Sequence, residues 1–108
     1  MPDVFLVVPC YNEARRLQVP RFESYLAAHP RVRVCFVDDG SGDGTREMLE
    51  TLHRRLPAQV TVLANDGNRG KAHAVRRGML HALADSDAPL LGYWDADLAT
   101  PLSELDLL

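Results

Sequence analysis

The stretch Val4–Glu13 reads VFLVVPCYNE and sets the pattern of the whole chain. It begins with the apolar, valine-rich run Val4–Val8, which is typical of a strand covered on both faces of a sheet. It continues into a polar loop, and a helical segment follows. The same unit recurs along the chain, and further strands are predicted over Val32–Val37, Val60–Ala64 and Leu90–Trp94.

Helical segments are expected between these strands. Pro20 interrupts the first connection, so the sequence predicts a turn after Glu13 and a helix only beyond the proline. The predicted helices cover Arg21–Ala28, Thr45–Leu56, Lys71–Ala84 and a segment that begins after Thr100 and Pro101. The apolar positions expected to face the core are Met48, Leu49, Leu52 and Leu56 in the second helix and Ala72, Val75, Met79 and Leu83 in the third.

Strands that alternate with helices form right-handed crossovers and a parallel sheet with helices on both faces. The predicted fold class is therefore α/β, in a three-layer Rossmann-like arrangement. The chain has 108 residues, a net charge of −3 and 46% hydrophobic residues. This ordinary globular composition excludes a disordered tail, a collagen-like repeat and a coiled coil, and the mild acidity argues against nucleic acid as the main partner. We expect one domain, residues 1–108.

The apolar runs and the cysteines indicate the cellular setting. The runs Val4–Pro9 and Ala88–Gly92 are far shorter than the ~20 residues of a membrane span, and Asp3 argues against a signal peptide. Cys10 and Cys35 lie in or beside apolar runs, so we expect them to be small buried thiols in a reducing compartment. The predicted location is the cytoplasm.

Parallel α/β sheets bind ligands beyond the carboxyl ends of their strands, so we expect the functional residues in the loops that follow the strands. These loops are Pro9–Glu13, Asp38–Thr45, Asn65–Lys71 and Asp95–Thr100. The first lacks the Gly-x-Gly-x-x-Gly of a dinucleotide site, and Ala72 stands where a P-loop needs Ser or Thr for magnesium. No Cys or His cluster has the spacing of a zinc site.

The run Asp95-Ala96-Asp97 leaves the last predicted strand. If the strand geometry persists, both carboxylates point to the same side and repel each other unless a cation lies between them. Mg²⁺ and Mn²⁺ take oxygen ligands of this kind. A turn in which an aspartate caps the next helix is an equally good interpretation of these residues alone.

Other polar residues at the strand ends each allow two interpretations. Asp38 and Asp39 would accept hydrogen bonds from a nucleotide, or would cap a helix and brace the glycine-rich turn. Tyr11 would stack on a base or be partly buried, and Glu13 would contact a ligand or favour a helix start. Lys71, the only lysine, would bind a phosphate with the backbone N–H groups of a helix start, or be solvated.

Taken together, the strand-end motifs resemble those of the family 2 inverting glycosyltransferases, whose fold is called GT-A. The motifs that carry the resemblance are Val8–Glu13, Val37–Ser41, Gly67–Lys71 and Asp95–Leu98, and the last, with Thr100-Pro101, is similar to the dolichyl- or polyprenyl-phosphate sugar synthase branch. The resemblance covers essentially the whole chain but only the donor-binding half of such an enzyme. It implies the strand order 3-2-1-4 and a truncated chain.

The resemblance implies a role for each matching residue. The base and ribose pocket would comprise Pro9, Tyr11 and Glu13, with Asp39 on the base edge and Asp38 nearby. Gly70 and Lys71 would lie close to the nucleotide, and the backbone of Ala96 would pack on it. Asp95 would contact the ribose or a metal-bound water, as part of the metal site. Asp97 would be the catalytic metal ligand, holding Mg²⁺ or Mn²⁺ against the diphosphate.

The resemblance implies inverting transfer of a sugar from a UDP- or GDP-linked donor to an acceptor, with polyprenyl phosphate as a candidate, at the cytoplasmic face of a membrane. The catalytic base would lie beyond Leu108, so this part alone would be inactive. Exposed strand edges and Leu105, Leu107 and Leu108 would favour self-association. One alternative is a nucleotide-binding module without transfer activity. A receiver-like signalling domain fits less well, because acid pairs are absent after the first strand.

Overall fold

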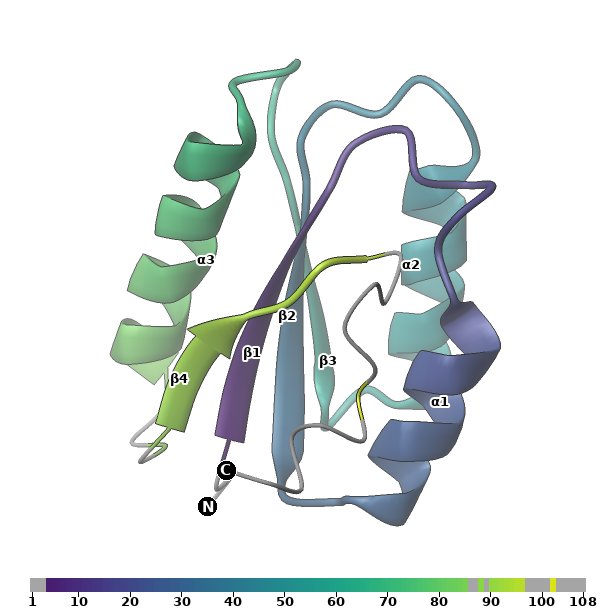
Figure 1. Ribbon diagram of the computed structural model, residues 1–108, viewed down its shortest axis with the longest axis vertical. Coiled ribbons are helices and arrows are strands. Elements are labelled where there is room, and N and C mark those ends of the chain that lie inside the picture. The colour runs from purple at the N-terminus through teal and green to yellow at the C-terminus, as the bar shows by residue number, and fades with distance from the viewer. Residues whose placement is uncertain (1–3, 86–87, 89, 97–101, 103–108) are drawn as a thin grey trace.

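The computed structural model describes residues 4–85, 88, 90–96 and 102 of the chain. Four parallel strands form one sheet in the order β3-β2-β1-β4 (Figure 1). The elements, in chain order, are β1 (Val4–Cys10), α1 (Val19–Ala28), β2 (Val32–Asp38), α2 (Thr45–Arg55), β3 (Val60–Ala64), α3 (Lys71–Asp85) and β4 (Leu90–Tyr93). The fold class, the parallel sheet and the strand order are confirmed.

Helices cover both faces of the sheet. Figure 1 shows α1 and α2 on one face and α3 on the other. The strands alternate accordingly: Leu6 and Val8 of β1 belong to the core under α1 and α2, whereas Phe5 and Val7 belong to the core under α3. The central strands β1 and β2 are therefore apolar on both faces, as the continuous apolar runs predicted.

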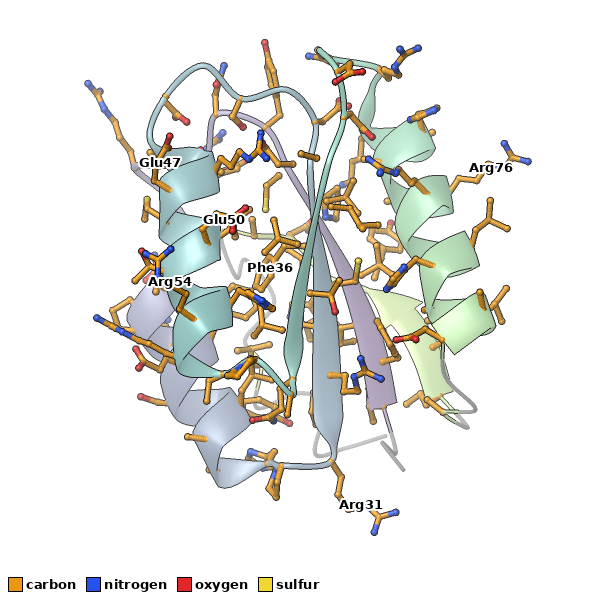
Figure 2. All side chains as sticks on the ribbon, turned by 180° about the vertical axis from the view of Figure 1, so that it is seen from behind. Arg31, Phe36, Glu47, Glu50, Arg54 and Arg76 are labelled. Carbon is orange, nitrogen blue, oxygen red and sulfur yellow. The ribbon has the colours of Figure 1, made fainter. Side chains whose placement is uncertain are left out.

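The core under α1 and α2 is the larger of the two. Phe36 of β2 packs edge-on against Phe22 of α1, with ring centroids 5.2 Å apart. Figure 2 shows Phe36 directed into this layer, while Glu47, Glu50 and Arg54 lie along the outer side of α2. Leu49 and Leu52 of α2 are fully buried in the same core, as expected from the helical period.

Of the four positions in α3 that were predicted to face the core, only Met79 packs against it. Ala72 is exposed and Leu83 is 67% exposed, while Val75 and Met79 are only half-buried. The buried positions are Ala74, Gly78 and Ala82. A Cβ atom at Gly78 would lie 2.3 Å from Cγ1 of Val7, so the helix backbone sits directly on β1. Small residues permit this close approach, and the larger ones are displaced to the sides of the helix.

The first helix also differs from the prediction. α1 begins at Val19, so Pro20 lies inside its first turn instead of ahead of it. A proline is tolerated there because the first N–H groups of a helix have no carbonyl partner in any case. β1 likewise continues through Pro9 to Cys10, and its pairing with β4 ends at Val7.

Some expectations concern residues outside the described part of the chain. These are the metal ligand Asp97, the helix after Thr100 and Pro101, and the terminal Leu105, Leu107 and Leu108. Among the residues that the structure describes, none of the helices has both the length and the apolar character that crossing a membrane requires.

Candidate functional site

A cavity of about 310 Å³ opens at the carboxyl ends of the strands, the upper end of the sheet in Figure 1. It lies where β1 separates β2 from β4, the point at which the strand order reverses. Its walls come from all four segments that follow the strands. The lining residues are Pro9, Cys10, Tyr11, Glu13, Asp39, Asn68, Gly70, Lys71, Ala74, Asp95 and Ala96.

Most of the predicted site residues meet in this cavity. Pro9, Tyr11, Glu13, Asp39, Gly70, Lys71, Asp95 and Ala96 all line it. Asp38 does not: it is buried, and its carboxylate accepts hydrogen bonds from the backbone N–H and the hydroxyl of Ser41. The bracing alternative is thus the one observed for Asp38. The cavity residues that the sequence reasoning missed are Cys10, Asn68 and Ala74.

Asn12 joins the loop after β1 to the loop after β2. Its backbone N–H donates to Oγ of Ser41 at 2.9 Å, and its Oδ1 accepts from the N–H of Gly42 at 2.8 Å. Asn12 has a φ of 50°, a conformation that asparagine tolerates better than most residues. Beside it, the N–H of Glu13 donates to Oγ1 of Thr45 at 2.8 Å. These bonds hold Tyr11 and Glu13 at the cavity.

Asp43 completes the connection at the start of α2. Its Oδ1 accepts from the backbone N–H of Thr45 at 2.9 Å and from the hydroxyl of the same residue. Its Oδ2 accepts from the N–H of Ala14 at 3.3 Å. The hydrogen bond from the Thr45 hydroxyl is the main reason that the pKa of Asp43 lies below its ordinary value. The cap on Thr45 is local, but the bond to Ala14 spans 29 residues, and this link to the loop after β1 was not predicted from sequence.

Asp39 is held by the loop between β3 and α3. Its Oδ1 accepts from Nδ2 of Asn65 at 2.8 Å and from the N–H of Arg69 at 2.9 Å, and its Oδ2 accepts from the N–H of Gly70 at 2.9 Å. Burial by itself would raise the pKa of this carboxyl. The hydrogen bonds from Arg69, Asn65 and Gly70 outweigh burial, and the pKa is lowered. Asp39 is therefore an ionised acceptor at neutral pH.

Glycines let the loops after β2 and β3 touch. Gly40 has a φ of 80°, and a Cβ atom there would lie 2.4 Å from the carbonyl carbon of Gly67. The backbones are thus in direct contact, and no larger residue fits at Gly40. This contact places the Asn65–Gly70 loop over Asp39.

Lys71 and Asp95 form a hydrogen-bonded ion pair in the wall of the cavity. The Nζ atom of Lys71 lies 3.2 Å from Oδ1 of Asp95 and 5.4 Å from the ring centroid of Tyr93. Their side chains are 60% and 47% exposed, respectively. Ion pairs this exposed contribute little to stability, so either group is available to a charged ligand at small cost.

The two cysteines are unpaired and buried, as predicted. Burial raises the pKa of Cys35 to about 12 and raises that of Cys10 further. Both remain thiols at neutral pH, although Cys10 lines the cavity.

The metal interpretation concerns Asp95 and Asp97, and only Asp95 belongs to the described residues. Among those residues, no group of three or more His, Cys, Asp or Glu side chains could hold a metal ion. Asp95 offers a half-exposed carboxylate at the cavity, the oxygen ligand that Mg²⁺ and Mn²⁺ prefer. A divalent ion at this carboxylate would take the place of the Lys71 ammonium, which lies 3.2 Å from Oδ1 of Asp95.

Comparison with known sequences gives a consistent picture. The sequence pattern of the glycosyl transferase family 2 matches residues 5–106. The dolichyl-phosphate beta-glucosyltransferase of Drosophila melanogaster is 35% identical over 115 residues, covering 98% of this chain and 34% of that protein. The undecaprenyl-phosphate 4-deoxy-4-formamido-L-arabinose transferase of Pectobacterium atrosepticum is 31% identical over 110 residues, covering 98% of this chain and 32% of that protein. The chain thus spans about a third of the length of these relatives.

Solved structures agree with the sequence comparison. The mannosyltransferase PcManGT from Pyrobaculum calidifontis, determined with GDP-Man and Mn²⁺, superposes with a TM-score of 0.71 at 28% identity. The match covers 89% of this chain and 28% of that one. TarS of S. aureus in complex with UDP superposes with a TM-score of 0.68 over 90% of this chain and 28% of that one. At 21% identity, this superposition shows a shared fold and no more.

Proposed function

Because this chain belongs to glycosyl transferase family 2, we propose that it binds the nucleotide sugar for a metal-dependent, inverting glycosyltransferase. The donor is a UDP- or GDP-linked sugar, and the acceptor is a polyprenyl phosphate. The observation that carries this proposal is the cavity at the carboxyl end of the sheet, to which all four strand-end segments contribute. Its volume of about 310 Å³ is at the lower end of the range for small-molecule sites.

The chemistry of the walls supports a nucleoside diphosphate. Tyr11 lines the cavity and is 42% exposed as a residue, so its ring is suitable for stacking on a base. Asp39 is an ionised acceptor for a base N–H group. Lys71 opens α3, where an ammonium group and helix N–H groups both favour phosphate. Pro9, Glu13, Gly70 and the backbone of Ala96 complete the proposed nucleotide pocket.

Asp95 and Asp97 are the proposed metal residues, with Mg²⁺ or Mn²⁺ as the ion. A bound divalent ion would stabilise the negative charge that develops on the leaving nucleoside diphosphate. Asp97 is the catalytic ligand in this proposal, and Asp95 contributes its carboxylate from the end of β4. The complex of PcManGT with GDP-Man and Mn²⁺ supports this donor class and this ion.

The acceptor class follows from the relatives, whose names specify dolichyl phosphate and undecaprenyl phosphate. Transfer with inversion needs a base on the face of the sugar opposite the leaving group. The acids of the cavity lie on the nucleotide side, so we propose that the base and the acceptor wall lie in the further length that the relatives possess. The 108 residues alone then bind the donor without transferring it, at the cytoplasmic face of a membrane.

Calorimetric titration of the chain with GDP and UDP, with Mn²⁺ or with excess chelator, tests the donor and metal roles. We expect binding that depends on Mn²⁺ and that Asp97→Asn abolishes while the circular dichroism spectrum stays unchanged. Asp66→Asn removes an exposed acid that does not line the cavity and serves as the control. Equal affinity in chelator would refute the metal role, and loss of folding in Asp97→Asn would indicate a capping aspartate instead.

A nucleotide-binding module without transfer activity would give the same calorimetric results as the transferase. Transfer of labelled sugar to a polyprenyl phosphate by the longer protein that carries this chain distinguishes the two. The transferase proposal predicts turnover by that longer protein and none by the 108 residues. Turnover by the 108 residues would mean that the catalytic base has been misplaced.

A further inference from the structure

We propose that Asn65 and Arg77 are positioning residues of the donor site: they fix the carboxylate of Asp39 and the loop that precedes α3. This inference rests on the proposed function and deepens it. Neither residue lines the cavity, and neither belongs to a role that the sequence motifs implied. Both act through Asp39, which does line the cavity.

The hydrogen bonds around Asp39 leave one acceptor position for a ligand. An ionised carboxylate oxygen accepts about two hydrogen bonds. Oδ1 already accepts two, from Asn65 and from the N–H of Arg69, at 2.8 and 2.9 Å. Oδ2 accepts one, from the N–H of Gly70 at 2.9 Å. Oδ2 is therefore the oxygen that can accept a donor group of the bound base.

The hydrogen bond from Asn65 leaves Oδ2 of Asp39 as the oxygen open to a ligand, and Arg77 fixes the orientation of the Asn65 amide. Nη1 of Arg77 donates to the side-chain Oδ1 of Asn65 and to the backbone oxygen of Ala64, both at 2.7 Å. A guanidinium can only donate, so the oxygen of the Asn65 amide must face Arg77. Its NH₂ group must then face Asp39. Arg77 thus fixes the orientation of the Asn65 amide, and that amide fixes the orientation of the Asp39 carboxylate.

The same contacts connect the elements that form the cavity wall. The two hydrogen bonds from Arg77 to Asn65 and from Asn65 to Asp39 are called the relay below. Arg77 lies on α3, Asn65 follows β3 and Asp39 follows β2, so the relay joins three elements at one edge of the sheet. The N–H groups of Arg69 and Gly70 that bind Asp39 immediately precede Lys71. A change in the relay therefore moves the acceptor for the base and the cation for the phosphate together.

Two other arginines provide matched controls. Arg76 is the neighbour of Arg77 on α3, and Figure 2 shows its side chain directed away from the molecule. Arg33 forms the corresponding brace at the other end of α3, where Nη2 lies 3.2 Å from Oδ2 of Asp85. Arg76→Met removes a charge from α3 without touching the relay. Arg33→Met removes a bracing arginine without touching the cavity.

The central variant is Asn65→Asp, which keeps an acceptor for Arg77 but turns a second carboxylate toward Asp39. We expect it to weaken binding of UDP or GDP, measured with Mn²⁺ by calorimetry, by at least about tenfold. Asn65→Ala tests the relay without the added charge and should weaken binding by about three- to tenfold. Arg77→Lys retains a cationic donor and should bind more tightly than Arg77→Met. Arg76→Met and Arg33→Met should bind like the wild type.

Amide hydrogen exchange supplies a readout that needs no nucleotide. In Asn65→Ala and Arg77→Met, we expect the amides of Arg69 and Gly70 to exchange faster while that of Ala82, near the far end of α3, is unchanged. A uniform increase along α3 would indicate a purely structural brace and overturn the inference. Wild-type affinity in Asn65→Asp would overturn it as well. If the wild type binds neither nucleotide, the proposed function itself fails, and the positioning role fails with it.

Discussion

Replacing Gly78 by alanine probes the contact that places α3, and with it Lys71, against the sheet. An added Cβ atom would lie 2.3 Å from Cγ1 of Val7, 3.2 Å from its Cγ2 and 3.1 Å from Cγ2 of Val37. Carbon atoms pack best at about 3.5–4.0 Å, so the first contact is more than an ångström too short. Val7 and Val37 are fully buried, and a valine side chain has little rotational freedom with which to avoid the methyl group.

Two opposing effects set the expected magnitude. Overpacking of a tight core costs about 1–3 kcal/mol. Alanine is a better helix former than glycine by about 1 kcal/mol, which offsets part of this cost. Because the contact with Val7 is more than an ångström too short, the cost belongs at the upper end of this range, and we expect Gly78→Ala to lower the free energy of unfolding by about 2 kcal/mol. For a chain of this size, that loss lowers Tm by about 8–16 °C.

Urea unfolding and thermal unfolding, followed by circular dichroism, measure this loss. Gly42→Ala is the control, because a Cβ atom at Gly42 meets nothing within 4 Å. Val7→Ala in the Gly78→Ala background should restore part of the lost stability, since it removes the methyl groups that clash. A Gly78→Ala variant as stable as the wild type would refute the close approach of α3 to β1.

Two further predictions concern the loops. Asn12→Gly keeps the φ of 50° but loses the hydrogen bond from the Gly42 N–H. Asn12→Ala loses that hydrogen bond and also disfavours the positive φ. Calorimetry should therefore show nucleotide affinity that falls from the wild type to Asn12→Gly and further to Asn12→Ala. Because the pKa of Asp39 is lowered below 3.8 in the folded state, the stability it contributes is complete above about pH 5 and is lost as the pH falls through the lowered value. The stability difference between wild type and Asp39→Asn, measured by urea unfolding, should therefore shrink from pH 6 to pH 3, and a constant difference would contradict this account.

The order of elements and the location of the site could be predicted from sequence because both depend on local patterns. The β3 range Val60–Ala64 agrees residue for residue, and β1, β2 and β4 agree within two residues at their ends. Once the strands are parallel, their following loops must meet at one edge of the sheet. The sequence directed attention to these loops, the family resemblance selected residues within them, and Tyr11, Asp39, Lys71 and Asp95 all line one cavity. Their roles toward a ligand stay predictions.

The buried side of α3 could not be predicted, because hydrophobicity was the wrong criterion there. Helical periodicity favoured Ala72, Val75, Met79 and Leu83, but the helix packs through Ala74, Gly78 and Ala82. Which side faces the sheet depends on how closely the two backbones can approach, and that distance involves the side chains of Val7 and Val37 on other elements. No single-element pattern contains this information.

Local periodicity and short motifs were enough to predict the parallel α/β fold, the family and the edge of the sheet that carries the site. The tertiary structure alone decided which motif residues face the cavity and which hold the loops. Asp38 and Asp39 are adjacent and chemically identical, yet Asp38 binds Ser41 within its own turn while Asp39 lines the cavity and binds Asn65, Arg69 and Gly70 from another loop. The physical reason is that a hydrogen bond depends on where its donor and acceptor lie in space, and the donors to Asp39 lie 26 to 31 residues away along the chain.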